Sequence, residues 1–316
     1  MTDLVARRFA GLILTLVVVS VFIFTVMDLL PGDPASIMLG TSASPDTLAA
    51  LQRELGLDRP LPLRYVEWLG GVLQGDLGVS YTYGVPVAGL IGERLAVTLP
   101  LASMAILVSL VIAIPLGVQA ARNHHRSVDL AVSLFSYAGI AVPSFWFGLL
   151  LIMFFATGLG WFPAGGFPGW SDGYATAFQA LLLPALALAL PQAAVLTRVT
   201  RSAILDVLAE DYIRTARAKG LSERAAVWRH ALPASLVPIV TVLGLQFTFL
   251  VAGAVLVENV FNLPGLGRLA FQSLSQRDVI VMQDVVLFFA ALVIIVNFLV
   301  DILYLVIDPR MRVASR

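Results

Sequence analysis

The chain has 316 residues, of which 59% are hydrophobic and 13% charged, whereas soluble domains are about 45–50% apolar and about 25% charged. Its 20 basic residues equal its 20 acidic ones, so no global positive field exists to attract nucleic acid. The absence of cysteine excludes disulfides, thiolate zinc sites and cysteine nucleophiles. This composition predicts a chain whose main solvent is membrane lipid.

Long apolar runs with almost no charge recur along the chain, and a bilayer-crossing helix needs about 20 such residues. We therefore expect an all-α, polytopic membrane protein with six transmembrane helices. The expected spans are Phe9–Met27, Leu95–Ala121, Leu130–Thr157, Gly173–Thr197, Ala231–Val257 and Asp284–Ile307. The first run is too long for a typical signal peptide, and no small-residue cleavage site follows it, so we expect it to be retained.

Several of these spans contain proline, namely Pro115, Pro143, Pro184 and Pro191. A proline inside a helix frees a carbonyl group and kinks the helix. Such kinks either serve ordinary helix packing or shape a water-filled path, and the sequence leaves both interpretations open.

The segment Pro31–Arg94, between the first two spans, predicts a small helical cap on the outer face. Ser44-Pro45-Asp46 is typical of a helix start, and Gly56 is expected to end that helix. A second short helix is expected over Leu63–Leu73. The cap serves either packing alone or docking of a soluble partner.

The polar segment Arg198–His230 predicts two short helices outside the membrane. Asp211–Lys219 is rich in helix formers, with its acid first and its base last, and Gly220 supplies a stop. The second helix is expected over Glu223–Ala231, ended by Pro233. Apolar residues of the first helix have no obvious partner in this chain, which favours insertion into a groove on another protein over a position on anionic lipid. These residues are Tyr212, Ile213 and Ala216.

The distribution of arginine and lysine sets the expected orientation. With the N-terminus inside, fourteen of these residues fall in inner segments and six in outer ones, which places both termini in the cytoplasm. The expected division is an N-terminal transmembrane helix over 1–30, an extracytoplasmic loop with short helices over 31–94, a five-helix core over 95–310 and a cytoplasmic tail over 311–316. Within the core, a cytoplasmic helix is expected at about 209–221.

A few polar residues lie inside the expected spans and are candidates for a gate or a path. They are Gln192, Gln246, Asn297 and Asp301. A charge at the bilayer centre costs about 2.5–3.5 kcal/mol on insertion scales. We therefore expect Asp301, which lies near the inner end of its span, either to pair with a neighbouring helix or to take part in gating. His124-His125 is interpreted as a solvated loop pair and not as a metal site.

Motifs for nucleotide binding and catalysis are not found. Ala218 precedes the only lysine, Lys219, so no Gly-Lys pair exists for a Walker phosphate cradle. Gly265-Leu-Gly267-Arg-Leu-Ala270 fits a loose dinucleotide fingerprint, but it lies between two spans and not in a βαβ unit, so we interpret it as a turn. No catalytic residue, metal site or cofactor is expected in this chain.

The inner segment resembles the coupling motif of binding-protein-dependent ABC importer permeases. Ala216, Gly220, Leu232 and Pro233 match that motif at the required spacing, while Arg214, Thr215 and His230 replace its usual Glu, Ala and Ile. The stretch Asp211–Gly220 is more similar to the dipeptide/oligopeptide/nickel subfamily. Six further stretches resemble the same subfamily, in order along the chain: Leu30–Pro34, Leu55–Pro60, Gly75–Ser80, Arg94–Leu99, Phe261–Gly267 and Asp308–Arg310. The extended loop after the first span resembles that of the B-type subunit.

This resemblance implies a type I ABC importer permease fold and a role as permease for dipeptides, oligopeptides or similar solutes in a bacterial inner membrane. It implies partnership with a second permease, two cytoplasmic ATPases that bind ATP and magnesium, and an extracytoplasmic solute-binding protein. The residues expected to couple this chain to an ATPase are Asp211, Tyr212, Arg214, Ala216, Arg217, Lys219, Gly220, Leu232 and Pro233. The alternative is a stand-alone ion-coupled secondary transporter, although the sequence shows no internal repeat of the kind common in that class.

Overall fold

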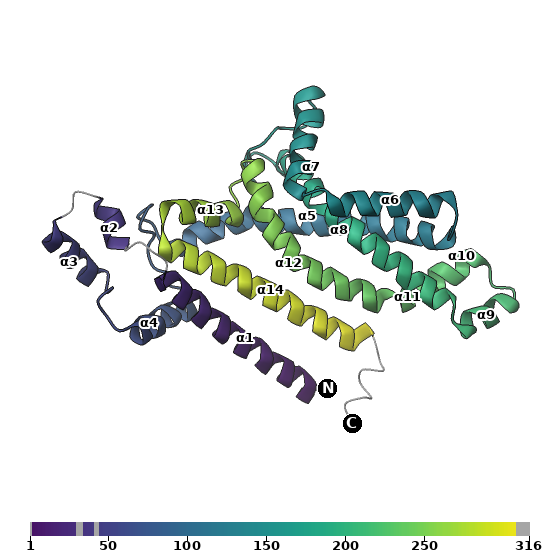
Figure 1. The fold of residues 1–316 in the computed structure, drawn as a ribbon, viewed down its shortest axis with the longest axis horizontal. Helices are drawn as coiled ribbons and strands as arrows, with labels where there is room; N and C mark the ends of the chain where they lie inside the picture. The colour runs from purple at the N-terminus through teal and green to yellow at the C-terminus, as the bar shows by residue number, and fades with distance from the viewer. Residues whose placement is uncertain (1, 30–33, 41–43, 308–316) are drawn as a thin grey trace.

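The structure, a computed structural model, describes residues 2–29, 34–40 and 44–307 (Figure 1). Within these residues the regular elements are helices, and the only extended pairing is an isolated bridge between Val79 and Pro86. The expected all-α class is confirmed. The motif Asp308–Arg310, the tail 311–316 and most of Leu30–Pro34 lie outside the described residues.

The helices follow one another in three groups along the chain. The first group is α1 (Thr2–Leu29), α2 (Pro34–Leu39), α3 (Pro45–Glu54) and α4 (Leu61–Gln74). The second is α5 (Val87–Arg122), α6 (Ser127–Ala141), α7 (Ser144–Leu151), the π-helix η1 (Ile152–Gly158) and α8 (Tyr174–Leu208). The third is α9 (Asp211–Ala218), α10 (Glu223–Ala226), the π-helix η2 (Val227–Ala231), α11 (Leu232–Ala234), α12 (Leu236–Val260), α13 (Leu266–Gln276) and α14 (Val279–Ile307).

The core lies where α8 packs between α5, α6 and α12, and small residues allow the close approach. The buried face of α8 is rich in alanine, and Gly139 of α6 lies so close to Ala194 that an added Cβ would approach its methyl group to 2.8 Å. Membrane helices use small residues in this way because lipid gives no hydrophobic drive for helix association. Leu101, Leu181 and Leu250 fill the centre of the core.

Among the described residues, five helices are long and apolar enough to cross a membrane, namely α1, α5, α8, α12 and α14, and a sixth span exists only if a bent pair is counted. The expected second span, Leu95–Ala121, lies within α5, which is longer and begins at Val87. The helix α5 continues through Pro115, and α8 continues through Pro184 and Pro191.

The third span differs from the expected continuous helix over Leu130–Thr157. Its two halves, Ser127–Ala141 and Ser144–Gly158, meet at an angle of 102°, so that α7 projects away from the bundle (Figure 1). Pro143 is the cause, because proline disfavours helical backbone in the residue before it. Val142 accordingly has extended backbone angles, with φ at −90° and ψ at 120°.

The helix α1 lies alongside α14, outside the core (Figure 1). Near the start of α1 and the end of α14, Arg8 forms an ion pair with Asp301. Phe9 packs edge-on against Phe298 in the same region. The expectation that Asp301 pairs with a neighbouring helix is therefore confirmed.

The opposite end of α14 is tied to the segment before α5 by buried polar contacts. The indole nitrogen of Trp68 donates to Asp284 at 2.8 Å, and the hydroxyl of Ser80 donates to Asp278 at 2.5 Å. The expected helices of this cap are confirmed: Ser44 accepts a hydrogen bond from the amide of Thr47 at the start of α3, and α4 covers Leu63–Leu73.

Candidate coupling site at the α9 end

The short helix α9 presents nearly all of its side chains to solvent. Asp211, Tyr212, Arg214 and Arg217 are exposed, and so is Lys219, which caps the helix. Arg214 and Asp211, one helical turn apart, form an exposed ion pair in which Nη1 lies 3.2 Å from Oδ1. Ile213 differs, because it is completely buried. The expectation that Ile213 has no partner in this chain was therefore wrong, whereas Tyr212 is half exposed.

The helix α9 is followed by Gly220, which has a left-handed backbone conformation. Its φ is +94°, and its amide donates to Arg217 while the amide of Leu221 donates to Ala216. These two hydrogen bonds form a Schellman motif, for which glycine is the preferred residue. The expected stop at Gly220 is confirmed, and the chain turns there into α10, where Ser222 accepts a hydrogen bond from the amide of Ala225.

The segment after this corner packs into the bundle. Val227 and Ala231 of η2 are buried against Val118 of α5 and Ile204 of α8. The helical path continues through Pro233 to Ala234, so the expectation that Pro233 ends it was wrong. Pro233 directly follows the π-helix η2, at the second residue of α11.

Leu232 connects the corner to the middle of the bundle. Its side chain packs against the cluster around Val118 and Ile204, and also against a second cluster that contains Leu196 and Ile239. The segment that follows α9 is therefore packed against residues of α5, α8 and α12.

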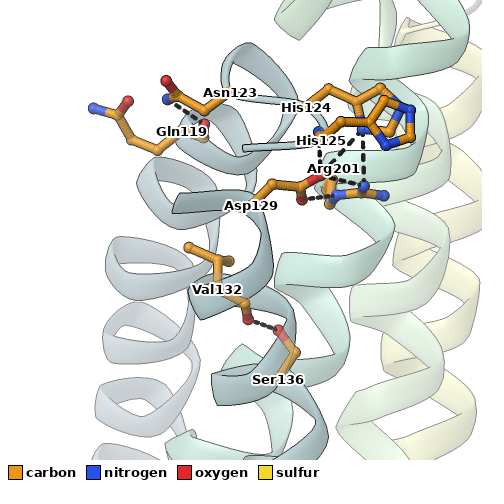
Figure 2. A network of polar contacts seen from close by, with 8 residues as sticks. All are labelled: Gln119, Asn123, His124, His125, Asp129, Val132, Ser136 and Arg201. Atoms are coloured by element: carbon orange, nitrogen blue, oxygen red, sulfur yellow. Dashed lines mark hydrogen bonds and ion pairs between the residues drawn. The ribbon is translucent and has the colours of Figure 1, made fainter. Parts of the chain in front are cut away.

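A buried ion pair fixes α6 to α8 at the same end. Asp129 receives two hydrogen bonds from the Arg201 guanidinium, Nε to Oδ1 at 2.5 Å and Nη2 to Oδ2 at 2.8 Å (Figure 2). The His124 ring nitrogen Nδ1 lies 3.1 Å from the same carboxylate, and the amide of His125 donates to it at 3.1 Å. Both histidines are nevertheless exposed in the loop before α6, as expected, and His124 in addition contacts Asp129.

The four candidate gate residues do not form one cluster of polar contacts. Gln192 and Gln246 are both buried, and Gln246 Nε2 donates to the Gln192 carbonyl at 3.2 Å. Asn297 instead donates to the Val293 carbonyl of its own helix, and Asp301 pairs with Arg8. The structure thus brings only the two glutamines together.

A buried carboxylate that the sequence analysis missed is Glu258, at the end of α12. Thr98 donates to Glu258 Oε1 at 2.7 Å, and the amide of Arg268 donates to Oε2 at 3.1 Å. Thr98 in turn accepts from the amide of Leu266, so these side chains satisfy the first turn of α13. Gly265 belongs to the same arrangement, since a Cβ there would lie 2.2 Å from the Glu258 carboxyl carbon. The expected turn was wrong for Leu266 and Gly267, which already belong to α13, while Gly265 is the residue that caps the start of that helix.

A cavity of about 520 Å³ opens between α6, α8 and α12, near the α9 end. Apart from Ser235, its polar lining comes from one face of α8, where Arg198, Ser202 and Asp206 follow at four-residue spacing. The Arg198 guanidinium lies 5.4 Å from the ring centre of Tyr137. Among the described residues no group of three His, Cys, Asp or Glu side chains is placed to hold a metal ion.

Comparison with known families gives two matches that together cover most of the chain. Residues 113–313 match the family described as binding-protein-dependent transport system inner membrane component. Residues 1–102 match the N-terminal family of the same membrane components.

Individual relatives match over nearly the whole chain. A probable peptide ABC transporter permease protein of Sinorhizobium fredii is 41% identical over 308 residues, covering 98% of each chain. A glutathione transport system permease protein of Salmonella typhi is 41% identical over 312 residues, covering 99% of each. Among solved structures, an inward-facing methionine ABC transporter aligns with a TM-score of 0.58 at 20% identity, covering 69% of this chain and 96% of that one.

Proposed function

This chain belongs to the family of binding-protein-dependent transport system inner membrane components, and on that premise we propose that it forms half of the path by which an ABC importer takes up peptides. The chain is an integral membrane permease subunit, and the alternative of a stand-alone ion-coupled transporter has no support from its relatives. Dipeptides, oligopeptides and related solutes such as glutathione are the proposed substrates.

The observation that carries the proposal is the construction of the α9 corner. An eight-residue helix exposes its charged face, is anchored by one buried side chain and ends in a left-handed glycine. Such a helix suits insertion into a groove on a partner protein. We assign that partner as one of two cytoplasmic ATPases, which bind ATP and magnesium for a chain that has no nucleotide site of its own.

The same importer would contain a second permease and a solute-binding protein, and we propose where each contributes. A second permease completes the path, and an extracytoplasmic binding protein delivers solute to the end that carries α13. The excess of arginine and lysine near α9 supports a cytoplasmic position for that end and for both termini. The proposed inner part of the path is the cavity lined by Arg198 and Asp206, whose opposite charges suit the two ends of a peptide. Gln192 and Gln246 remain proposed path residues at greater depth.

The test is a Gly220→Asp variant in the assembled importer, reconstituted in vesicles with its binding protein. A side chain in a left-handed conformation costs about 1–2 kcal/mol, which is enough to displace the corner. We expect uptake of a labelled dipeptide to fall about tenfold while ATP hydrolysis continues. Gly84→Asp is the matched control, because Gly84 also has a positive φ of 65° and open space around it but lies far from α9 in sequence.

Wild-type uptake by the Gly220→Asp variant, with insertion verified, would remove the coupling role of α9. Uptake that needs an ion gradient and no ATP would instead overturn the importer assignment itself.

A further inference from the structure

A second cavity, of about 350 Å³, lies between the last turns of α5 and the segment that follows the α9 corner. Its walls are Pro115, Val118, Gln119 and Arg122 from α5, with Arg224 from α10 and Trp228 from η2. It shares no residue with the proposed path cavity next to α8. The site is therefore separate from the surfaces to which we assign solute passage and ATPase contact.

The charge of this cavity is positive and uncompensated. Arg122 and Arg224 both line it, and no acidic side chain does. Neither arginine forms an ion pair within the part of the chain that the structure describes. The Nε of Arg122 is in addition shielded from solvent and has no hydrogen-bond partner. A buried N–H without a partner is costly, and arginine binds phosphate groups well because its planar fork donates two hydrogen bonds together.

The remaining walls place the cavity at the surface of the membrane. Arg122 is the last residue of a span, while Pro115 and Val118 are apolar and lie one to two turns deeper in the same helix. Trp228 is 44% exposed, and tryptophan is enriched at the level of lipid headgroups. Gln119 adds a polar side chain that points away from the Asp129–Arg201 network (Figure 2).

We propose that this cavity binds the phosphate of an anionic phospholipid. The two guanidinium groups hold the phosphate, the half-exposed indole packs against the glycerol region, and the apolar wall of α5 receives the start of an acyl chain. A free phosphate ion has no apolar part that could contact the wall of α5. We therefore propose a phospholipid, and not a free ion, as the source of the phosphate group. Basic pockets between membrane helices bind anionic headgroups by this combination.

The position of the cavity gives the lipid a structural effect. It joins α5 to α10 and η2, and this segment leads directly from the Gly220 corner into the bundle. A bound phosphate also neutralises the repulsion between the two arginines. Lipid occupancy therefore holds the corner in the position from which α9 projects. This conclusion stands whether or not the solute proves to be a peptide.

The experiment is native mass spectrometry of the full-length chain, purified in detergent with its associated subunits and titrated with phosphatidylglycerol. We expect one tightly retained phosphatidylglycerol per chain and at least tenfold weaker retention in the double variant Arg122→Gln/Arg224→Gln. The matched control is Arg126→Gln/Arg229→Gln, which removes two exposed arginines of the same region that do not line the cavity. Arg122→Lys/Arg224→Lys keeps the charge and is expected to recover part of the binding.

Other ligands test the chemistry on the wild-type chain, so the result does not depend on how well a variant folds. Glycerol 3-phosphate should not displace the lipid, and phosphatidylcholine should bind at least tenfold more weakly. Equal retention of phosphatidylcholine, or displacement by glycerol 3-phosphate, would overturn the proposal. A photoreactive residue at Trp228 should capture lipid, and capture of an ATPase subunit instead would reassign the cavity to a protein contact.

Discussion

The outer helices at the two ends of this molecule, α13 and α9, are held in different ways. At the α13 end, buried polar groups lock one segment to another, as in Thr98–Glu258, Trp68–Asp284 and Ser80–Asp278. At the α9 end, the outermost helix is anchored by the single buried side chain of Ile213 and otherwise faces solvent.

This difference indicates that α13 is held rigidly and that α9 can move. Buried hydrogen bonds are directional and costly to break, so they fix α13 and the start of α14 in one arrangement. Apolar contact is non-directional, so a helix that depends on it can tilt or shift with little loss. The α9 end is thus suited to follow a partner, and the α13 end to keep its shape. Substitutions at the two ends should differ accordingly.

The largest effect is expected from Glu258→Ala at the α13 end. The Thr98 hydroxyl and the Arg268 amide would both lose their acceptor, and each buried donor left unsatisfied costs about 1–3 kcal/mol. We expect a clear fall in the thermal unfolding temperature of the purified chain in detergent. Thr98→Ser keeps the hydroxyl and serves as the control with near-native stability. An unchanged unfolding temperature for Glu258→Ala would show that the α13 end is not locked as described.

An intermediate and local effect is expected from Ile213→Ala. Truncation of a buried isoleucine costs about 2–5 kcal/mol where the site is packed, and here the cost falls on the docking of α9 alone. Trypsin should then cleave at Arg214 and Lys219 at least tenfold faster, while the global unfolding temperature changes little. Tyr212→Ala removes a half-exposed neighbour and should leave the cleavage rate as it is. Equal protection in both variants would contradict the anchoring role of Ile213.

The smallest effect on stability is expected from Arg214→Gln. Its ion pair with Asp211 is exposed, and exposed pairs contribute little because water and salt screen them. Thermal unfolding should therefore remain unchanged, whereas dipeptide uptake by the assembled importer should fall severalfold if α9 docks through this face. Unchanged uptake would move the proposed ATPase contact to other residues of α9.

Local patterns in the sequence predicted the short helices well. Asp211–Gly220 and Ser44-Pro45-Asp46 carry start and stop signals that depend only on neighbouring residues, and the structure has both helices with those ends. The angle at Pro143 could not be predicted, because proline alone does not decide between a kink within a helix and a break: α5 and α8 continue through theirs.

Long-range polar partners were the part that local patterns did not reveal. Glu258 lies just beyond the expected end of its span and bonds to Thr98, which is 160 positions away. Asp129 and Arg201 were not singled out by the sequence, and they meet across α6 and α8 although they lie 72 positions apart. The sequence feature that could have indicated these contacts is a carboxylate or guanidinium at the end of an apolar run. Such a group needs a partner if the fold buries it.

The bend between α6 and α7 has a consequence for the surroundings of this chain. With 15 residues at about 1.5 Å each, α6 extends only about 22 Å, less than the hydrocarbon thickness of about 30 Å. The backbone therefore leaves the helical path while still at membrane depth, beside Pro143, which is exposed on this chain. Non-helical backbone is not tolerated against acyl tails. The strip around Val142–Ser144 consequently faces water or another subunit and marks a sector of the perimeter from which lipid is excluded.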